Sequence, residues 1–298
     1  MNARYATLAG GLGILISLPL FTPPYFMHLL IQILLWGFIY TAWSMMGRFG
    51  FVSLGHGAFM GVGAYVPALL WNYQGVTPWI GIPLGVLLSV LLALVIGYPC
   101  FRLKVVGHYF ALVTLALSQV VMLSIVAARD VTGGSLGFTQ RAVGHSWYAL
   151  QFSDKRYFYA ISEDEEAAAS IGINVMREKL RVTMISAALT ALGGAIFGQY
   201  LMYLNPETVS GISVSLQIVF AAIVGGMYAM LGPTVGALLT ISLNEGLRVG
   251  FATNFIGAAN TIYGVLLILC IIFMPRGILG ALERMSIRRS PEKAVAAE

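Results

Sequence analysis

Residues 79–100 read WIGIPLGVLLSVLLALVIGYPC and include no charged side chain. An apolar run of about 20 residues can cross the hydrocarbon core of a bilayer as a helix, and soluble domains seldom contain one. Similar runs lie on both sides of this one, so the sequence predicts an all-α fold, a polytopic transmembrane helical bundle of about nine helices. We expect these helices over residues 5–21, 26–46, 54–71, 79–100, 109–127, 182–204, 212–230, 233–249 and 256–274.

The composition also fits a membrane protein. The chain is 58% hydrophobic and 10% charged, whereas soluble domains carry about 25% charged residues. The net charge of +5 does not indicate a nucleic-acid partner, because the basic residues flank apolar runs. Basic residues beside membrane spans face the cytoplasm, which predicts a multi-pass protein of a bacterial-type inner membrane with a cytoplasmic C-terminus. The basic residues expected inside include Arg48, Arg102, Lys104, Arg177, Lys179 and Arg181.

The apolar runs predict one transmembrane domain over residues 1–298, with a cytoplasmic loop over residues 161–181 and a basic cytoplasmic tail over residues 276–298. Pro23 and Pro24 follow the first run without a small-residue cleavage site, so we expect a retained helix rather than a signal peptide. The two cysteines lie in or at the edge of apolar runs and predict neither a disulfide framework nor a metal site.

The polar loop contains the stretch SEDEEAAASIGIN at residues 162–174. Ser162 and Glu165 form a capping box, the acidic first turn complements the helix dipole, and Gly172 is suited to end a helix. This pattern predicts a helix of about nine residues, which is too polar to enter the bilayer and too short to be stable alone in water. The helix is therefore either an ordinary cytoplasmic connector or a segment that docks on another protein.

The segment EDEEAAASIGI at residues 163–173 resembles the coupling loop of ABC-importer permeases, in which an EAA stretch is followed by a glycine. Its form is similar to that of the branched-chain amino acid (LIV-type) permease family, in particular the M-type subunit. Urea and short-amide permeases of the same superfamily share these motifs. Further similar stretches occur in the family's order and cover most of residues 26–280. They are SLGHGAFMGVGAY (53–65), YFALVTLALSQ (109–119), TGGSLG (132–137) and VGGMYAMLGPTVG (224–236).

The resemblance implies a permease subunit of an ATP-driven ABC importer for branched-chain or other hydrophobic amino acids, which works by alternating access. The implied partners are a second related permease subunit, two ATPase subunits and a periplasmic or extracellular solute-binding protein. ATP and magnesium bind to the ATPases in such importers, so the resemblance implies no cofactor and no enzymatic activity in this chain. The implied ATPase-coupling residues are Glu163, Glu165, Glu166, Ala167, Ala168 and Gly172.

Small and polar residues in two apolar runs are candidates for lining a translocation path. Hydroxyl and imidazole groups can bond a passing solute, and an unpartnered polar face is disfavoured in lipid, so we expect these side chains to face the bundle interior. Each residue type also has a purely structural alternative. The glycine can serve close helix packing, the histidine can be structural, and the hydroxyls can bond back to carbonyls of their own helix. The candidates are Ser53, His56, Gly57, Thr114 and Ser118.

Other classes of function fit the sequence less well. An ion-coupled secondary transporter normally has an ionisable residue deep in a span, whereas Glu207 and Glu245 lie near the outer ends of their runs and are assigned no role. The four histidines lack metal-ligand spacing, and the sequence contains neither a serine elbow nor a phosphate-binding loop. An ABC permease for urea or short amides is the main alternative, and an ion-coupled secondary transporter is the more distant one.

The charge pattern places two neighbouring parts of the chain on opposite sides of the membrane. Counted from the N-terminus, five crossings leave residues 129–156 outside, whereas counting back from the C-terminus places residues 163–171 inside. The intervening YFYAI at residues 157–161 is too short to cross a core of about 30 Å. We therefore expect that the sequence lacks a segment of about 25–35 residues near Ala160–Ser162, which would bring the bundle to about ten helices.

Overall fold

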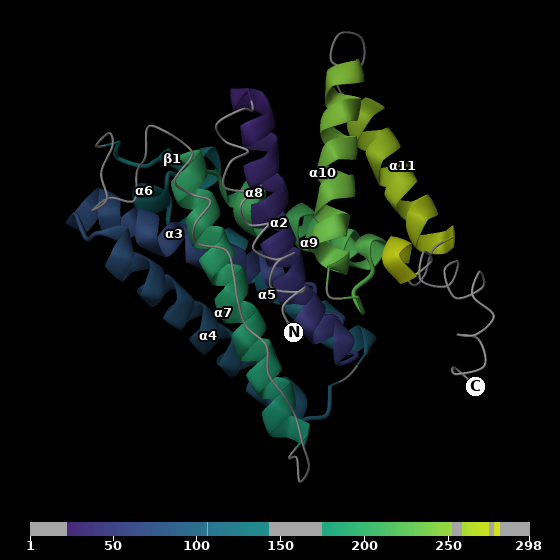
Figure 1. Ribbon diagram of the computed structural model, residues 1–298. Helices are drawn as coiled ribbons and strands as arrows, with labels where there is room; N and C mark the ends of the chain where they lie inside the picture. Colours follow the sequence, from purple (N-terminus) through teal and green to yellow (C-terminus); the bar gives the residue numbers. More distant parts are fainter. Residues whose placement is uncertain are drawn as a thin grey trace, which may run out of the picture.

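The structure, a computed structural model, describes residues 23–105, 107–142, 175–229, 231–251, 258–273 and 277–280. These residues form a bundle of α-helices with one short antiparallel pair of strands (Figure 1). The longer helices are α2 (Pro24–Arg48), α3 (His56–Gln74), α4 (Pro78–Arg102), α5 (His108–Ala127), α7 (Val175–Leu201), α9 (Ile212–Gly225), α10 (Gly232–Phe251) and α11 (Ala258–Phe273). The short elements are α6 (Arg129–Thr132), the 3₁₀ turn η1 (Gly134–Leu136), α8 (Pro206–Ser210), β1 (Phe138–Thr139) and β2 (Tyr203–Leu204).

The all-α fold predicted from the sequence is confirmed. Among the described residues, α3, α10 and α11 are helical as predicted but are shorter or less apolar than the strongest candidate spans. The helix predicted over residues 5–21 lies outside the described residues. The described part of the chain has five candidate spans long and apolar enough to cross a membrane, which are Pro24–Arg48, Pro78–Arg102, His108–Ala127, Met176–Leu201 and Pro206–Gly225.

Local sequence explains where several helices begin and end. Pro24 and Pro78 occupy the first turns of α2 and α4, where a missing backbone N–H costs nothing. The Thr77 side chain accepts a hydrogen bond from the Trp79 N–H and so caps α4. Two predicted boundaries were wrong. The run 212–230 ends as a helix at Gly225, because Gly226 turns the chain with φ +106°. The helix predicted over residues 182–204 begins earlier, at Val175, and so includes the basic residues before the apolar run.

Basic residues gather at one end of the bundle, which we call the basic end and define by Arg48, Arg102 and Lys179. The Lys179 ammonium lies 4.6 Å from the centre of the Phe51 ring, which in turn packs against Phe101. The Arg48 guanidinium donates hydrogen bonds to backbone carbonyls of the turn between α9 and α10. The ends of α2 and α4 and the beginning of α7 therefore meet here, as the charge pattern predicts.

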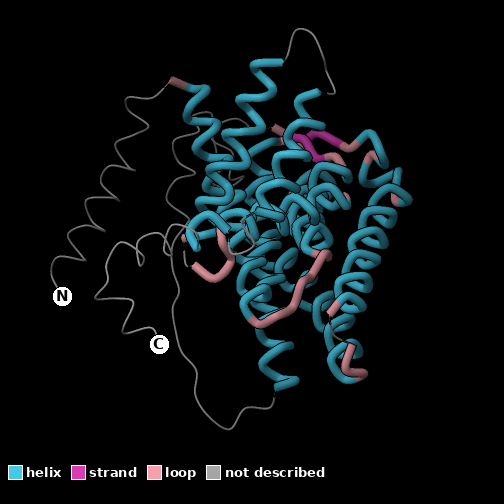
Figure 2. Tube along the Cα trace, turned by 90° about the vertical axis from the view of Figure 1, so that its right-hand side faces the viewer, coloured by secondary structure: helices cyan, strands magenta, loops and turns pink. Residues whose placement is uncertain are grey.

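The opposite end, which we call the strand end, carries α6, β1 and β2 (Figures 1 and 2). Strand β1 pairs with β2 immediately after α7, and the Arg141 N–H donates to Asn72 Oδ1 at 2.8 Å. Residue 142, the last described residue before the gap at 143–174, therefore lies at the strand end, and Val175, the first residue after that gap, begins α7 at the basic end. Its two flanks lie at opposite ends of the bundle, as the charge count predicts, whereas residues 160–162 lie outside the described residues.

The core lies where α2, α3, α7 and α9 meet, and the apolar surface of the outer helices faces away from it. Trp43, Met60 and Ile218 are fully or almost fully buried in the central cluster. By contrast, α4 exposes Leu87, Leu91 and Val95 on one face, with relative exposures of 53%, 46% and 62%. Such a wide apolar surface is the type that lipid covers, because all backbone polar groups of a helix are satisfied internally.

Candidate functional site

The six residues predicted to couple to an ATPase lie outside the described residues, because the gap extends over residues 143–174. Their arrangement stays a prediction. The five predicted translocation residues are all described and all buried. Four of them lie around α5, where two interrupted segments of the chain meet, and the fifth faces α7.

The first interrupted segment is residues 51–55, which are non-helical and enter the bundle before α3 begins. Its backbone groups are satisfied by side chains. The Trp43 indole N–H donates to the Ser53 carbonyl at 2.7 Å, the Leu54 N–H donates to Thr114 Oγ1 at 3.0 Å, and the Gly55 N–H donates to Ser53 Oγ at 3.3 Å. Non-helical backbone at membrane depth is tolerated where protein buries it or where it lines a cavity.

Thr114 holds the non-helical segment 51–55 against α5. It lies in the second turn of α5, and its hydroxyl also bonds back to the Phe110 carbonyl at 3.0 Å. A Cβ added at Gly55 would lie 2.7 Å from the Thr114 carbonyl oxygen, so the loop and α5 are packed as closely as a glycine allows. The predicted back-bonding alternative and the predicted inward face of Thr114 are therefore both realised in the same side chain.

Ser118 lies one turn further along α5 and is at the centre of a directed chain of hydrogen bonds. Its hydroxyl donates to the Ser210 carbonyl at 3.0 Å, because a carbonyl can only accept. The Ser215 hydroxyl, 3.1 Å away, must then donate to Ser118, and it accepts from the Gly57 N–H at 3.0 Å. We call Gly57, Ser118, Ser210 and Ser215 the Ser118 cluster. It joins α3, α5, α8 and α9.

The second interrupted segment is the junction of α8 and α9 at Gly211. Gly211 is extended, with φ −64° and ψ 163°, and it separates Ser210 at the end of α8 from the first residue of α9. The Ser210 side chain is fully buried, and its hydroxyl has no hydrogen-bond partner among the described residues. The break at Gly211 therefore lies beside Ser118, and the break at residues 51–55 lies beside Thr114, one turn earlier on α5.

Glycines permit this meeting of helices. A Cβ at Gly57 would lie 2.7 Å from Ser215 Oγ and 2.8 Å from Ser118 Oγ, and a Cβ at Gly61 would lie 2.7 Å from the Ser210 Cβ. Helices packed on small residues approach closely enough for side chains to bridge between backbones. The structure thus shows the close-packing alternative for Gly57, and it brings Gly57 into direct contact with the predicted Ser118.

His56 faces away from the Ser118 cluster. Its Nε2 lies 2.8 Å from the Ser186 hydroxyl of α7, and that hydroxyl donates to the Ala42 carbonyl of α2 at 2.7 Å. Since Ser186 has a single hydrogen, His56 Nε2 carries the proton and donates, which leaves Nδ1 as an acceptor. The imidazole therefore cross-links α3, α7 and α2, as the structural alternative proposed.

Sequence reasoning missed Ser186, Ser210 and Ser215. Other hydroxyl residues lie close to each of them in the sequence, and a hydroxyl at one position does not indicate its partner. The spacing of Thr114 and Ser118 predicted that both lie on one face of α5. Which residues of α7, α8 and α9 contact the predicted residues depends on how the helices pack across the bundle, and spacing does not predict that. Chemically, the cluster holds hydroxyls and backbone groups, which can exchange hydrogen bonds with a neutral or zwitterionic solute.

Comparison with known proteins agrees with a transport role for this arrangement. The family model for the permease component of the branched-chain amino acid transport system matches the chain over residues 25–154 and 147–274. These matches include every residue of the Ser118 cluster. No solved structure matches the chain.

Three curated relatives are permeases. The high-affinity branched-chain amino acid transport system permease protein LivM of Salmonella typhimurium is 26% identical over 284 residues, covering 79% of this chain and 65% of LivM. The LivH protein of Escherichia coli strain K12 is 25% identical over 277 residues, covering 80% of this chain and 88% of LivH. The ribose import permease protein RbsC of Haemophilus influenzae is 28% identical over 195 residues, covering 56% of this chain and 60% of RbsC. The chain thus spans 65% of the length of LivM.

Proposed function

Because the chain belongs to the family of branched-chain amino acid transport system permeases, we propose that it is the membrane-spanning subunit of an ATP-driven importer for branched-chain amino acids. The family match over most of the chain is the observation that carries this proposal. The LivM and LivH relatives support the class of solute, since their names specify branched-chain amino acids. The RbsC relative shows that a ribose import permease has a related sequence, so the solute needs its own test.

The interior of the bundle supports a transporter. Discontinuous helices near the middle of the membrane are a recurrent feature of transporter cores, because unwound backbone offers polar groups that a continuous helix does not. Here residues 51–55 and the junction at Gly211 are such interruptions. Thr114 bonds to the first, and Ser118 bridges the two sides of the second through short hydroxyl contacts. In the conformation described, the cluster is closed. Gly57 and Ser118 are buried within it, and Ser53 and Thr114 are buried at the neighbouring segment 51–55.

The proposed mechanism is alternating access. Opening the Ser118 cluster exchanges hydrogen bonds between helices for hydrogen bonds to the solute, so the polar groups stay satisfied in both states. His56, which links three helices, holds α3 in place against α7 while the α5 side moves. The proposed path therefore runs between α3, α5, α8 and α9.

The proposed assembly contains a second related permease, two ATPases and a solute-binding protein. The basic end is proposed to face the cytoplasm, following the usual distribution of basic residues, and the strand end to face the solute-binding protein. The acidic helix predicted at residues 163–171 would then emerge on the ATPase side, because α7 begins at the basic end. ATP and magnesium bind to the ATPases in this proposal, and this chain transmits their movement.

Uptake measurements test both the energy source and the solute. Cells that lack their own branched-chain importers are given this chain with its partner subunits, and entry of labelled leucine is followed. We expect uptake to stop when ATP is depleted by arsenate and to continue when a protonophore collapses the proton gradient. The reverse pattern would identify an ion-coupled secondary transporter instead.

The same cells identify the solute by competition. Excess valine and isoleucine should displace labelled leucine, while urea, propionamide and ribose should not. Uptake of labelled urea or propionamide, with no uptake of labelled leucine, would point to the amide alternative. Displacement by ribose would point to the sugar permeases.

A further inference from the structure

A pocket of about 420 Å³ opens between the strand-end halves of α2 and α10, away from the Ser118 cluster. The α2 wall includes Tyr25 and Trp36, and the α10 wall includes Glu245 and Arg248, on faces formed by residues three or four positions apart. Gln217 of α9 and Tyr263 of α11 complete the lining. Pockets of this size commonly hold small ligands.

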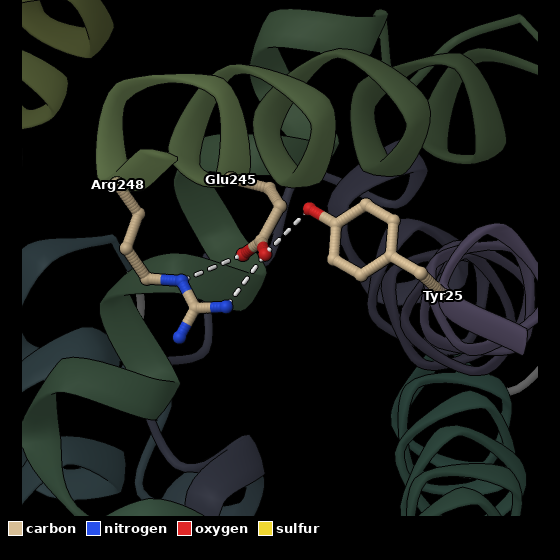
Figure 3. Close-up of polar contacts among 3 residues, drawn as sticks. All are labelled: Tyr25, Glu245 and Arg248. Atoms are coloured by element: carbon tan, nitrogen blue, oxygen red, sulfur yellow. Dashed lines mark hydrogen bonds and ion pairs between the residues drawn. The ribbon is translucent and has the colours of Figure 1, made fainter. Parts of the chain in front are cut away.

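An ion pair lies at the mouth of this pocket (Figure 3). Arg248 Nε lies 3.0 Å from one oxygen of Glu245, and Arg248 Nη2 lies 2.6 Å from the other. The Tyr25 hydroxyl donates to the Glu245 carboxylate at 2.8 Å. The carboxylate is thus held from both walls of the pocket, and the Nη1 group of Arg248 points away from it.

The ion pair is accessible to a ligand. The Arg248 side chain is 70% exposed and the Glu245 side chain is 22% exposed. Exposed pairs on one helix contribute little to stability, because water competes for both charges. Exchange of partners with a ligand that supplies both charges therefore costs the protein little.

The rest of the pocket combines apolar side chains with amide groups, the His28 imidazole and the hydroxyls of Thr240 and Tyr263. Trp36 and Ile241 line opposite walls, and Leu29 lies beside them on α2. The Gln217 amide donates to the buried Tyr40 hydroxyl at 3.0 Å, which holds this side chain in place on the α9 side. The pocket therefore combines two opposite charges at one side with an apolar surface large enough for an aliphatic side chain.

We propose that this pocket is a binding site for a zwitterionic, aliphatic amino acid, with its carboxylate on Arg248, its ammonium on Glu245 and its side chain against Trp36 and Ile241. Arg is suited to bind a carboxylate through two parallel hydrogen bonds. The ligand's carboxylate takes the place of Glu245 beside Arg248, and its ammonium takes the place of Arg248 beside Glu245. The net charge of the pocket therefore stays zero when the ligand binds. The inference rests on the proposed import function in one respect: that function places the site on the transport route, at the end of the bundle that faces the solute-binding protein.

The charge arrangement disfavours other solutes. Urea or an amide has no charge to exchange with the ion pair and so gains little by entering. A free amine or a free carboxylic acid can bond to only one member of the pair, so it gains one charge-assisted contact where a zwitterion gains two. The pair therefore selects a solute that carries both charges close together.

Chemical protection of a pocket cysteine tests this site without the solute-binding protein. The complete permease–ATPase complex carrying Asn244→Cys is placed in nanodiscs and labelled with a membrane-impermeant maleimide. The unsubstituted complex gives the background from the two natural cysteines, of which Cys100 is buried. Leucine is compared with leucinamide, which lacks the carboxylate, and with 4-methylpentanoate, which lacks the ammonium.

We expect leucine to slow labelling of Asn244→Cys and the two half-charged analogues to have little effect. Adding Arg248→Gln or Glu245→Gln should weaken protection by leucine about 10-fold or more, as for loss of a charge-assisted hydrogen bond. Arg129→Gln is the matched control, because Arg129 is an exposed arginine on α6 at the same end but outside the pocket. It should leave protection unchanged.

Three results would overturn the site. These are no protection by leucine, equal protection by all three compounds, or protection that persists in Arg248→Gln. Failure of Asn244→Cys to react at all would also overturn it, because the pocket would then be covered in the complex. Leucine uptake by the same complex, reconstituted in liposomes with its solute-binding protein, is measured in parallel, because a nanodisc encloses no compartment. Uptake without protection rejects the site alone, whereas protection without uptake rejects the proposed import function and keeps the site.

Discussion

The Ser118 hydroxyl of α5 donates a hydrogen bond of 3.0 Å to the carbonyl of Ser210, at the last residue of α8. This bond connects a continuous helix to a break in the next helical segment, and the Ser215 hydroxyl beyond the break completes the connection. All three serines are fully buried. In the conformation described, Ser118 therefore positions α8 and α9, the two helices on either side of the break, relative to each other.

Ser118→Ala should lower the stability of the protein. The substitution leaves the Ser210 carbonyl and the Ser215 hydroxyl without this partner, and interhelical hydrogen bonds in membranes contribute about 0.6–2 kcal/mol. We expect a lower Tm for the detergent-solubilised complex. Ser124→Ala on the same helix is the control, since Ser124 is exposed and its hydroxyl bonds to its own helix at Val120. Equal effects of the two substitutions would contradict a bridging role for Ser118.

Gly57→Ala should be more damaging than its single methyl group suggests. The added Cβ would lie 2.7 Å from Ser215 Oγ, and overpacking of this kind typically costs about 1–3 kcal/mol. Gly264→Ala in α11 is the matched control, because nothing lies within 4 Å of the added atom. It should be neutral or slightly stabilising, since alanine favours helix over glycine. Tm and leucine uptake report both effects, and an unaffected Gly57→Ala protein would show that the packing at α3 is not tight.

Much of this fold could be predicted from the sequence, and the reasons are local. The charge-free run in α4 and the basic residues beside the spans depend only on how lipid treats apolar and charged groups. The entry of residues 51–55 into the bundle could not be predicted, because its backbone is satisfied by Trp43 on one helix and Thr114 on another. Spacing predicted a shared face for Thr114 and Ser118, but no spacing rule pairs Ser118 with Ser210 across the bundle.

The pocket shows a second limit of sequence reasoning. Glu245 lies near the end of its helix and was assigned no role, because exposure at a helix end is common. Its three hydrogen-bonded contacts come from Arg248 on its own helix and from Tyr25 on α2. The pairing of Glu245 with Arg248 follows from their spacing, whereas the approach of Tyr25 depends on how α2 packs against α10.

Glu166→Lys should abolish leucine uptake and leave membrane insertion intact. Glu166 lies in the acidic helix predicted to dock on an ATPase, and charge reversal there opposes basic residues on the partner. Reversal of Glu163, Glu165 and Glu166 together should do the same, but Glu165 also belongs to the predicted capping box, so Glu166 alone is the cleaner probe. Glu292→Lys in the basic tail is the control. Normal uptake by the triple variant would remove the basis for a coupling role.

The purified assembly should contain one copy of this chain with one copy of a different, related permease and two ATPases. The M-type resemblance and the LivM and LivH relatives motivate this stoichiometry. Native mass spectrometry of the complex isolated with a tag on this chain measures it directly. An active complex with two copies of this chain and no second permease would exclude the heterodimer.

The protein made from the natural gene should be heavier than the 32.1 kDa of this sequence. We expect an additional segment of about 25–35 residues near residues 160–162, long enough for one spanning helix. The alignment with LivM extends over 284 residues but involves 79% of this 298-residue chain, so the relative carries residues that have no counterpart here. Intact-mass measurement and peptide mapping across residues 155–181 decide the matter. A mass of 32.1 kDa, with a peptide that joins Ala160 directly to Ile161 and Ser162, would reject the prediction.

The contact between Arg48 and the turn after α9 has a consequence for how the protein is made. Arg48 donates hydrogen bonds of 2.8 Å to the Met227 carbonyl and 3.1 Å to the Ala229 carbonyl, which are synthesised long after α2 has left the ribosome. Trp36 and Tyr40 of α2 also pack in the same core as residues of α9 and α10. During synthesis Arg48 and the face of α2 that packs against α9 and α10 therefore stay unmatched until the last third of the chain arrives, whereas α3 and α7 can pack against α2 earlier. Premature termination before α10 would leave α2 in the membrane with its α3 and α7 contacts but without a partner for the face that α10 covers.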